Sequence, residues 1–177
     1  MLPFEGIRVL DLTHVFAGPF STFQLAVLGA EVIKIEPFDD PDMTRSEGPN
    51  VDDNLQLMGL QFLAQNGGRK CMGLNLKSSE GQKILTRMIK LSDVLVHNYS
   101  LNASKRLGLT YERLKKLNPK IVFCAISGYG HTGPKAEHPA FDIVVQAYTG
   151  SMYANGTNKS TPIRIGPAVI DYGTGSQ

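Results

Sequence analysis

Short apolar runs alternate with segments of helical periodicity along most of this chain. Five runs have the length and the aliphatic, β-branched composition of strands buried in a sheet: residues 7–12, 30–35, 71–76, 93–97 and 121–126. Strands that alternate with helices indicate parallel pairing through right-handed crossovers. The pattern therefore predicts an α/β fold, with a Rossmann-like open parallel sheet and flanking helices.

The first helix is expected to start at Pro19, because the fixed φ of proline suits the first turn of a helix. Four apolar residues then recur on one face and are predicted to be buried: Phe20, Phe23, Val27 and Leu28. Gly29 is the expected C-terminal cap of this helix.

Further helices are predicted after the later strands. Ser78 is expected to cap a helix that runs to about Leu91. The predicted buried stripe of this helix consists of Ile84, Leu85, Met88 and Leu91. Shorter helices are predicted at 110–117, where Thr110 is the cap, and at 141–148.

The last residues combine a strand-like run, 163–170, with a helix that opens at Asp171. A helix that starts there has almost no following chain to pack against. We therefore expect a truncated polypeptide that carries part of a larger domain.

Length and composition fit a single domain with its own core. The chain has 177 residues, of which 42% are hydrophobic and 19% charged. The 18 basic and 16 acidic residues give a net charge of +2, too small to indicate a nucleic-acid partner. The long uncharged stretch 12–30 is too polar for a membrane helix. Two cysteines and no basic-then-apolar leader favour a reducing cytoplasm.

A nicotinamide-binding site is one alternative. Residues 128–133 read G-x-G-x-x-G after a predicted strand. A dinucleotide site needs a helix to begin there, yet Pro139 interrupts the next turn, and no acid follows between Ile143 and Ile170. The motif is therefore weak support for NAD.

Histidine and cysteine spacing predicts no metal site. The four histidines are interpreted as surface or loop residues. They are His14, His97, His131 and His138. Cys71 and Cys124 fall in predicted buried strands and are interpreted as small core residues.

Two features point to an anionic ligand or a nucleophile. Residues 101–120 carry six bases against the acid Glu112, which fits either a solvated helix face or a site for a ligand with several phosphates. Asp171 fits either a structural helix cap or a reactive carboxylate. Gly173 and Gly175 behind it favour reactivity, because glycines leave backbone amides free to stabilise an oxyanion.

Several stretches, in one order along the chain, resemble a single family. They are residues 6–13, 17–19, 28–36, 42–45, 106–111, 117–119, 127–134 and 141–142. The chain resembles the class III CoA-transferases, which include formyl-CoA transferase and carnitine CoA-transferase. The resemblance also accounts for the glycine motif, because the Ser-Gly-aromatic-Gly stretch 127–130 is a signature of this family.

The resemblance implies CoA transfer between carboxylic acids with Asp171 as the nucleophile. This carboxylate would attack an acyl-CoA thioester to give an aspartyl anhydride, from which CoA forms an aspartyl-CoA thioester. Coenzyme A and acyl-CoA would be substrates, with a carboxylic acid acceptor and no permanently bound cofactor. The resemblance assigns CoA binding to Phe16, Ala17, Arg69, Asn98, Tyr99, Arg106 and Asp142.

Differences from the family narrow this expectation. Phe16 replaces the glutamine of formyl-CoA transferase, which argues against oxalate specificity. Phe141 replaces the histidine of acyl-CoA racemases, which disfavours racemisation because phenylalanine cannot move a proton.

Family members are longer, with a second small domain, and form interlocked dimers. We therefore expect residues 1–177 to be the N-terminal part of the large domain, completed in a homodimer or by a second chain. The alternatives are a non-catalytic CoA-binding or assembly subunit and an inactive fragment.

Overall fold

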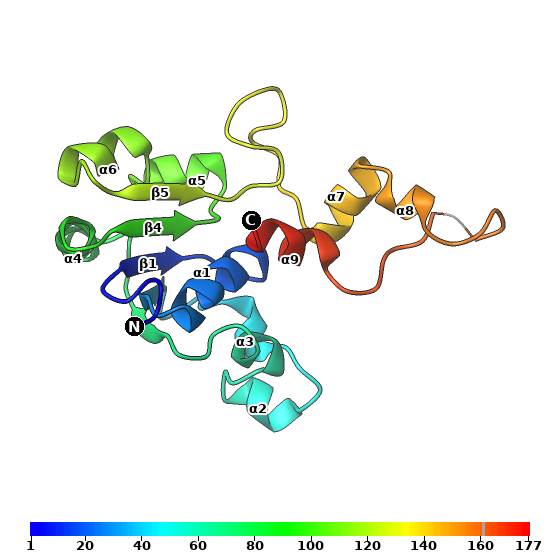
Figure 1. Cartoon of the computed structure of the whole chain (residues 1–177), viewed down its shortest axis with the longest axis horizontal. Coiled ribbons are helices and arrows are strands. Elements are labelled where there is room, and N and C mark those ends of the chain that lie inside the picture. The colour runs from blue at the N-terminus through cyan, green and yellow to red at the C-terminus, as the bar shows by residue number, and fades with distance from the viewer. Residues whose placement is uncertain (161) are drawn as a thin grey trace.

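The computed structural model describes residues 1–160 and 162–177. In this part of the chain, five strands form one parallel sheet in the order β3-β2-β1-β4-β5 (Figure 1). The strands are β1 (Arg8–Leu12), β2 (Glu31–Glu36), β3 (Lys70–Gly73), β4 (Val94–His97) and β5 (Val122–Ala125). In the central strand β1, Leu10 lies opposite Ile33 of β2 and Leu95 of β4. The predicted Rossmann-like α/β fold is confirmed.

Helices cover both faces of the sheet. On one face, Leu25 and Ala26 of α1 (Ala17–Val27) pack against a small cluster that includes Val9 and Val32. The larger core lies on the other face, under α4 (Ser79–Lys90) and α6 (Tyr111–Leu117). Its buried members include Leu10, Leu12, Ile35, Leu85, Ile89, Leu95, Leu109 and Leu114.

The remaining elements lie beyond the carboxyl ends of the strands or at the sheet edges. They are η1 (Met43–Ser46), α2 (Val51–Leu55), α3 (Leu60–Leu63), α5 (Leu101–Arg106), α7 (Asp142–Tyr148), α8 (Ser151–Ala154) and α9 (Val169–Gly175). Figure 1 shows α7 and α8 projecting from the body, after which the chain returns in α9. The pattern did not predict α2, α3, α5 or α8, because helices of four to six residues are too short to show periodicity.

The caps predicted at Ser78, Thr110 and Gly29 are confirmed, whereas α1 begins at Ala17, two residues before Pro19, and α9 begins at Val169, two residues before Asp171. The Ser78 hydroxyl accepts a hydrogen bond from the Gly81 amide at 3.0 Å, and Thr110 caps α6 in the same way. Gly29 follows α1 with φ of +105°, a backbone conformation that favours glycine.

The predicted buried face of α1 was wrong. Phe20 and Phe23 are only partly buried, and Val27 and Leu28 are exposed. The helix instead turns Gly18, Pro19 and Thr22 inward. The inward turn is set by a polar contact, because the Thr22 hydroxyl donates to the buried Asp11 carboxylate at 2.8 Å.

The predicted stripe of α4 was partly wrong. Leu85 is fully buried and Met88 packs against the core, as expected. Ile89 completes the buried face, whereas Ile84 and Leu91 are exposed. Apolar residues at neighbouring positions made two stripes possible, and the tilt of the helix on the sheet selects one of them.

The strand predicted over 163–170 was also wrong. Within the described residues 162–177, the chain is irregular up to Ala168, and α9 begins at Val169. The Ile165 amide donates to the side chain of Gln146 at 2.9 Å, in place of a neighbouring strand. Gly166 and Pro167 within the run also oppose a strand.

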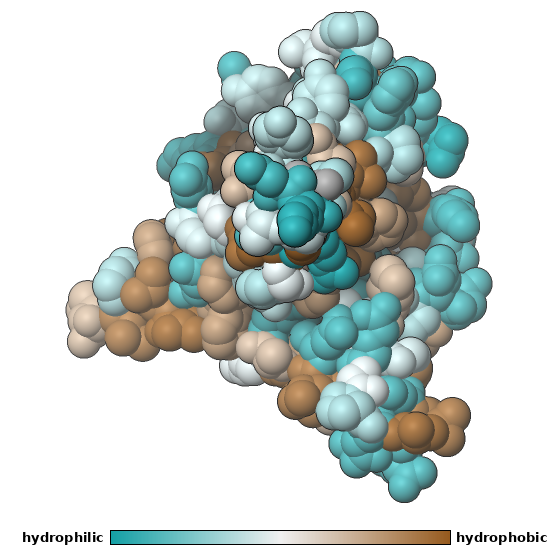
Figure 2. Space-filling view, turned by 90° about the vertical axis from the view of Figure 1, so that its right-hand side faces the viewer, coloured by the Kyte–Doolittle hydropathy of each residue, from teal (hydrophilic) through white to brown (hydrophobic). Residues whose placement is uncertain are grey.

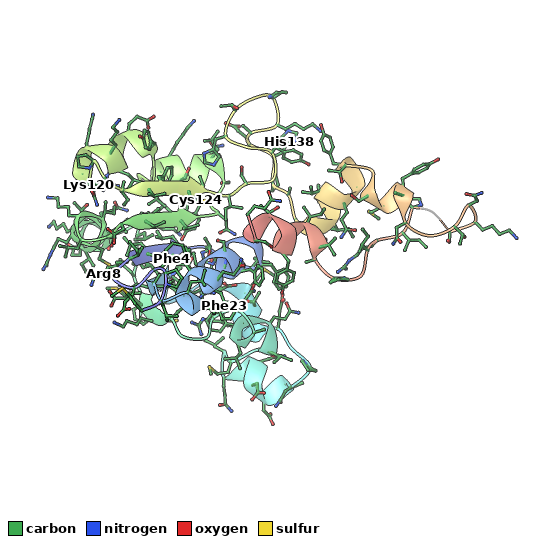
Figure 3. All side chains as sticks on the ribbon, viewed as in Figure 1. Phe4, Arg8, Phe23, Lys120, Cys124 and His138 are labelled. Atoms are coloured by element: carbon green, nitrogen blue, oxygen red, sulfur yellow. The ribbon has the colours of Figure 1, made fainter. Side chains whose placement is uncertain are left out.

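Both cysteines lie on strands, but their interpretation as core residues was wrong. Cys71 on β3 and Cys124 on β5 are exposed, because these are the edge strands of the sheet. Figure 3 shows Cys124 on β5, with Arg8 and Lys120 at the amino end of the sheet and His138 beyond its carboxyl end.

Large apolar side chains are exposed on several helices. They include Val51, Leu55, Leu60, Leu63, Ile143 and Val144. Figure 2 shows separate groups of hydrophobic residues on the face toward which α7 and α8 project. Among the described residues, no helix has both the length and the apolar character needed to cross a membrane.

Candidate active site

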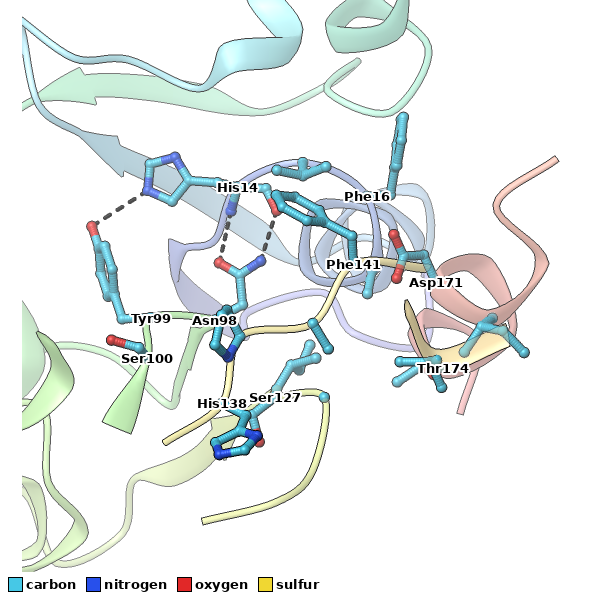
Figure 4. Close-up of a pocket in the computed structure, with 18 of the residues that line it drawn as sticks. His14, Phe16, Asn98, Tyr99, Ser100, Ser127, His138, Phe141, Asp171 and Thr174 are labelled. Atoms are coloured by element: carbon cyan, nitrogen blue, oxygen red, sulfur yellow. Dashed lines mark hydrogen bonds between the residues drawn. The ribbon is translucent and has the colours of Figure 1, made fainter. Parts of the chain in front are cut away.

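A cavity of about 330 Å³ lies beyond the carboxyl ends of β1, β4 and β5. Its walls come from the segments that follow these strands, 14–17, 98–101, 126–128 and 136–141, together with α9. The chain order of the strands reverses between β1 and β4, and ligands of open α/β sheets bind at such a point. Figure 4 shows Phe16, Phe141 and Asp171 among the residues that line this space.

Asn98 fixes one wall of the cavity. Its side-chain oxygen accepts the His14 backbone amide at 2.9 Å, and its side-chain nitrogen donates to the His14 carbonyl at 2.7 Å (Figure 4). The hydroxyl of Tyr99 lies 3.4 Å from His14 Nε2. Through these contacts the segment after β4 holds the segment after β1 in place.

Val15 in this wall has strained backbone. Its φ is +71°, a conformation that is unfavourable for a β-branched residue. The amide of Val15 donates to Asp42 Oδ1 at 3.2 Å, and its carbonyl accepts from Gln65 at 2.5 Å. Lys34, fully buried, donates to the Thr13 carbonyl at 2.6 Å and pairs with Asp42 at 3.1 Å. Buried charges therefore hold the strained segment.

The same ion pair keeps Asp42 ionised. Burial alone would raise the pKa of this carboxyl, but the neighbouring Lys34 ammonium and the backbone amide of Val15 outweigh burial and lower it. The charge that anchors the cavity wall is therefore present across the neutral range.

Asp171 lies in the first turn of α9, with its carboxylate in the cavity. Burial, together with the nearby Asp142 carboxylate, raises the pKa of Asp171 to about 6. Asp142 Oδ1 accepts the backbone amides of Ile170 at 2.8 Å and of Asp171 at 3.3 Å. Asp171 is thus a carboxylate of raised basicity that remains largely ionised at neutral pH.

α9 is fixed from its other side by α1. The ring of Tyr172 packs edge-on against Phe20, with centroids 4.9 Å apart, and against Phe16 at 5.7 Å. The carbonyl of Gly175 accepts the side-chain amide of Gln24 at 2.9 Å. A Cβ at Gly175 would lie 2.4 Å from an α1 carbonyl, so this close approach needs glycine.

Five of the eight site residues expected from the sequence line the cavity. They are Phe16, Ala17, Asn98, Tyr99 and Asp171. Asp142 lies behind the wall, where it is buried beneath Ile170 and Asp171. Arg106 is exposed in the last turn of α5, outside the cavity lining.

The expected contact between Arg69 and CoA finds no support in the geometry. The guanidinium of Arg69 is fully buried and pairs with Asp11 at 2.5 Å. It also donates to the Thr22 hydroxyl at 2.7 Å and to the Pro19 carbonyl at 2.6 Å. The resemblance assigned Arg69 to CoA binding, whereas in the structure its guanidinium neutralises the Asp11 carboxylate inside the fold.

Two histidines of the cavity were overlooked. His14 and His138 line it, although their spacing suggested ordinary loop residues. Burial lowers the pKa of His14, and the Lys34 ammonium lowers it further, so this imidazole is neutral near pH 7. The position of His14 directly after β1 was the available signal, whereas His138 lies in the long loop after β5 and had none. His97, also interpreted as a surface or loop residue, is fully buried in β4, where burial lowers its pKa to about 4.

Comparison with known proteins agrees with this geometry. The sequence pattern described as CoA-transferase family III matches residues 4–177. The chain belongs to CoA-transferase family III. It is 44% identical over 164 residues to the acetyl-CoA:oxalate CoA-transferase of Acetobacter aceti, which covers 93% of this chain and 41% of that protein. It is 40% identical over 175 residues to the succinyl-CoA:glutarate CoA-transferase of Mus musculus, covering 99% of this chain and 39% of the relative.

Two solved structures share the fold of this chain. A CAIB/BAIF family protein from Brucella suis superposes with a TM-score of 0.90 at 34% identity, covering 99% of this chain and 46% of that one. A hypothetical protein from Mycobacterium tuberculosis gives a TM-score of 0.88 at 28% identity, with 99% and 48% covered. This family III chain spans about two fifths of the length of the two curated relatives named above.

Proposed function

We propose that this chain supplies the nucleophile and part of the CoA-binding surface of an enzyme that moves CoA between carboxylic acids. The observation that carries the proposal is the position of Asp171, whose carboxylate lies in the cavity at the sheet's carboxyl edge. Membership of CoA-transferase family III supports the reaction class.

The reaction proceeds through two kinds of covalent intermediate on Asp171, an acyl-aspartyl anhydride and an aspartyl-CoA thioester. The ionised carboxylate attacks the acyl-CoA thioester carbon, and the C–S bond breaks to give an acyl-aspartyl anhydride and CoA thiolate. The thiolate attacks the aspartyl carbonyl, and the donor acid leaves as its carboxylate, which gives an aspartyl-CoA thioester. The acceptor carboxylate then reverses these two steps, so that the new acyl-CoA leaves and the Asp171 carboxylate is restored.

The surroundings of Asp171 suit this chemistry. Its raised pKa makes the ionised form a better nucleophile, while most molecules are ionised at neutral pH. The N-terminus of α1 reaches the cavity at Phe16 and Ala17, and no side chain caps it, so its first-turn amides are free for an oxyanion. Apolar walls that include Phe141 and Ile170 limit the access of water, which would hydrolyse both intermediates.

The long CoA molecule would extend from the cavity along α5. Leu101, at the start of this helix, lines the cavity, and the exposed Arg106 lies at its other end. The guanidinium there is suited to a CoA phosphate. Asn98 and Tyr99 line the cavity just before α5 and would contact the CoA molecule there.

The complete enzyme would include chain beyond these residues or a second copy. The exposed apolar side chains of α2, α3 and α7 favour such a partner, whether a homodimer or a complementing chain. A cytoplasmic location fits a substrate that is a free thioester. Oxalate and glutarate, from the names of two relatives, are the first acceptors to test, and Phe16 predicts that glutarate is preferred over oxalate.

The proposal is tested by trapping the covalent intermediate. The chain is mixed with succinyl-CoA and then with hydroxylamine or borohydride, and the modified residue is located by mass spectrometry. Modification is expected at Asp171, to be absent in Asp171→Asn, and to be unchanged in Asp52→Asn, whose carboxylate is exposed on α2. Transfer that persists in Asp171→Asn would refute the mechanism, whereas CoA binding without any adduct would favour the non-catalytic subunit.

A further inference from the structure

We propose that Asp142, held by Gln146, is a positioning residue for Asp171: it caps α9 from the neighbouring helix and fixes the direction of the Asp171 carboxylate. This inference rests on the proposed function, because it assigns a task to the carboxylate beside the nucleophile. The Asp142 side chain is nearly completely buried and is absent from the cavity lining.

The start of α9 has no cap of its own. Its N-cap residue, Ala168, has no side chain that could accept a hydrogen bond. Asp142 Oδ1 instead accepts the amides of Ile170 and Asp171, the second and third residues of the helix. These are the amides that an N-cap side chain ordinarily satisfies. A side chain of α7 thus caps the start of α9, which its own N-cap residue does not do.

The capping carboxylate cannot rotate freely. The other oxygen of Asp142 accepts the side-chain amide of Gln146 at 2.5 Å, and Gln146 is itself fully buried. The oxygen of Gln146 accepts the Ile165 amide at 2.9 Å. Asp142 and Gln146 lie one turn apart on α7, so this helix holds both ends of the segment that leads into α9.

The charge of Asp142 acts on Asp171 as well. None of the ion pairs among the described residues includes Asp142 or Asp171, so the two carboxylates have no basic partner in common. The titratable groups that face or adjoin Asp171 are Asp142 from α7, Tyr172 on α9, and His14 and His138 across the cavity. Of these, Asp142 raises the pKa of Asp171 in addition to burial. Asp142 therefore acts on both the position and the basicity of the nucleophile, while burial makes the larger contribution to its raised pKa.

Two substitutions separate these effects. Asp142→Asn keeps an oxygen for the two α9 amides but removes the charge. Its new NH2 group meets the Gln146 oxygen only if Gln146 reverses its amide, which gives up the hydrogen bond from the Ile165 amide. Asp142→Ala removes both the cap and the charge. Asp52→Asn, which removes an exposed carboxylate from α2 outside the cavity, is the matched control for the loss of charge.

The readouts are the carboxyl titration of Asp171, followed by ¹³C NMR, and the pH profile of adduct formation from succinyl-CoA. In Asp142→Asn we expect the titration midpoint to fall by about one pH unit while the plateau rate is kept. In Asp142→Ala we expect the plateau rate to fall roughly 10- to 100-fold with an unchanged KM for succinyl-CoA, because the nucleophile is misplaced.

Unchanged titration in Asp142→Asn, or a loss of thermal stability in Asp142→Ala with an unchanged plateau rate, would overturn the inference. If Asp142→Ala fails to fold, Asp142→Asn decides alone. The titration does not depend on turnover, so it tests the inference even if Asp171→Asn still transfers CoA. In that case the proposed function fails by itself.

Discussion

Arg69 provides a direct test of whether a basic residue serves the fold or the ligand. Its guanidinium is fully buried with Asp11, and the two groups lie 2.5 Å apart. Replacing Arg69 by leucine leaves the Asp11 carboxylate inside the protein without its counter-charge. Breaking a buried ion pair from one side costs about 3–5 kcal/mol. This is a large part of the roughly 5–15 kcal/mol that stabilises an ordinary domain.

The assay is chemical and thermal unfolding of the chain. For a domain of this size, such a loss lowers Tm by roughly 6–20 °C. The double variant Asp11→Asn with Arg69→Leu should recover about 1–2 kcal/mol, because the buried charge is gone while an oxygen remains for Thr13. Arg106→Leu, at an exposed position, is the control and should change stability by less than about 0.5 kcal/mol. An Arg69→Leu protein with the Tm of the original chain and weakened CoA binding would refute this reasoning and restore Arg69 as a ligand.

Three further predictions concern the cavity. Gly175→Ala should destabilise the chain by about 1–3 kcal/mol, because its Cβ meets an α1 carbonyl. Gly173→Ala should instead stabilise α9 by about 0.5–1 kcal/mol, because its Cβ meets open space. Denaturant unfolding compares the two variants. Asn98→Asp should lower the free energy of unfolding by about 1–3 kcal/mol, because it sets a carboxylate against the His14 carbonyl. An equal loss at pH 7 for Asn98→Gln would count against the pair of hydrogen bonds between Asn98 and the His14 backbone. The pKa of Asp171 in the folded chain is raised to about 6, so its contribution to stability is present at low pH and is lost as the pH rises from about 4 to 6. Asp171→Asn should therefore be more stable than the original chain at pH 7 and lose that advantage below pH 4.

The sheet could be predicted from the sequence because its strands are nearly continuous apolar runs. Such a run is buried only when both of its faces are covered, which places it inside the sheet, as Leu10 and Leu95 illustrate. Helix faces were predicted less well, because a polar contact between Thr22 and Asp11 rather than apolar periodicity orients α1. The run 163–170 contains strand-forming residues but has no partner strand among the described residues, and pairing is what makes a strand.

The candidate site was predicted in part for a related reason. Asn98 follows β4 and is carried to the cavity by the topology, whereas Asp171 was assigned from the family motif. The role of Arg69 depends on which carboxylate it meets 58 positions away along the chain, and no local pattern indicates that contact. Asp142 likewise acts across 28 positions on α9, which only the folded chain reveals.

The segment 126–141 closes one side of the cavity without belonging to the sheet. Its attachment to the strands is brief, with Ile126 donating to the His97 carbonyl at 2.9 Å before the chain departs. Amino-acid exchanges at Ser127, Ala140 or Phe141 therefore change the shape of the cavity while the strands of the sheet are left unchanged. Natural divergence and laboratory selection can therefore change the shape of the cavity at these positions, while the sheet keeps its packing.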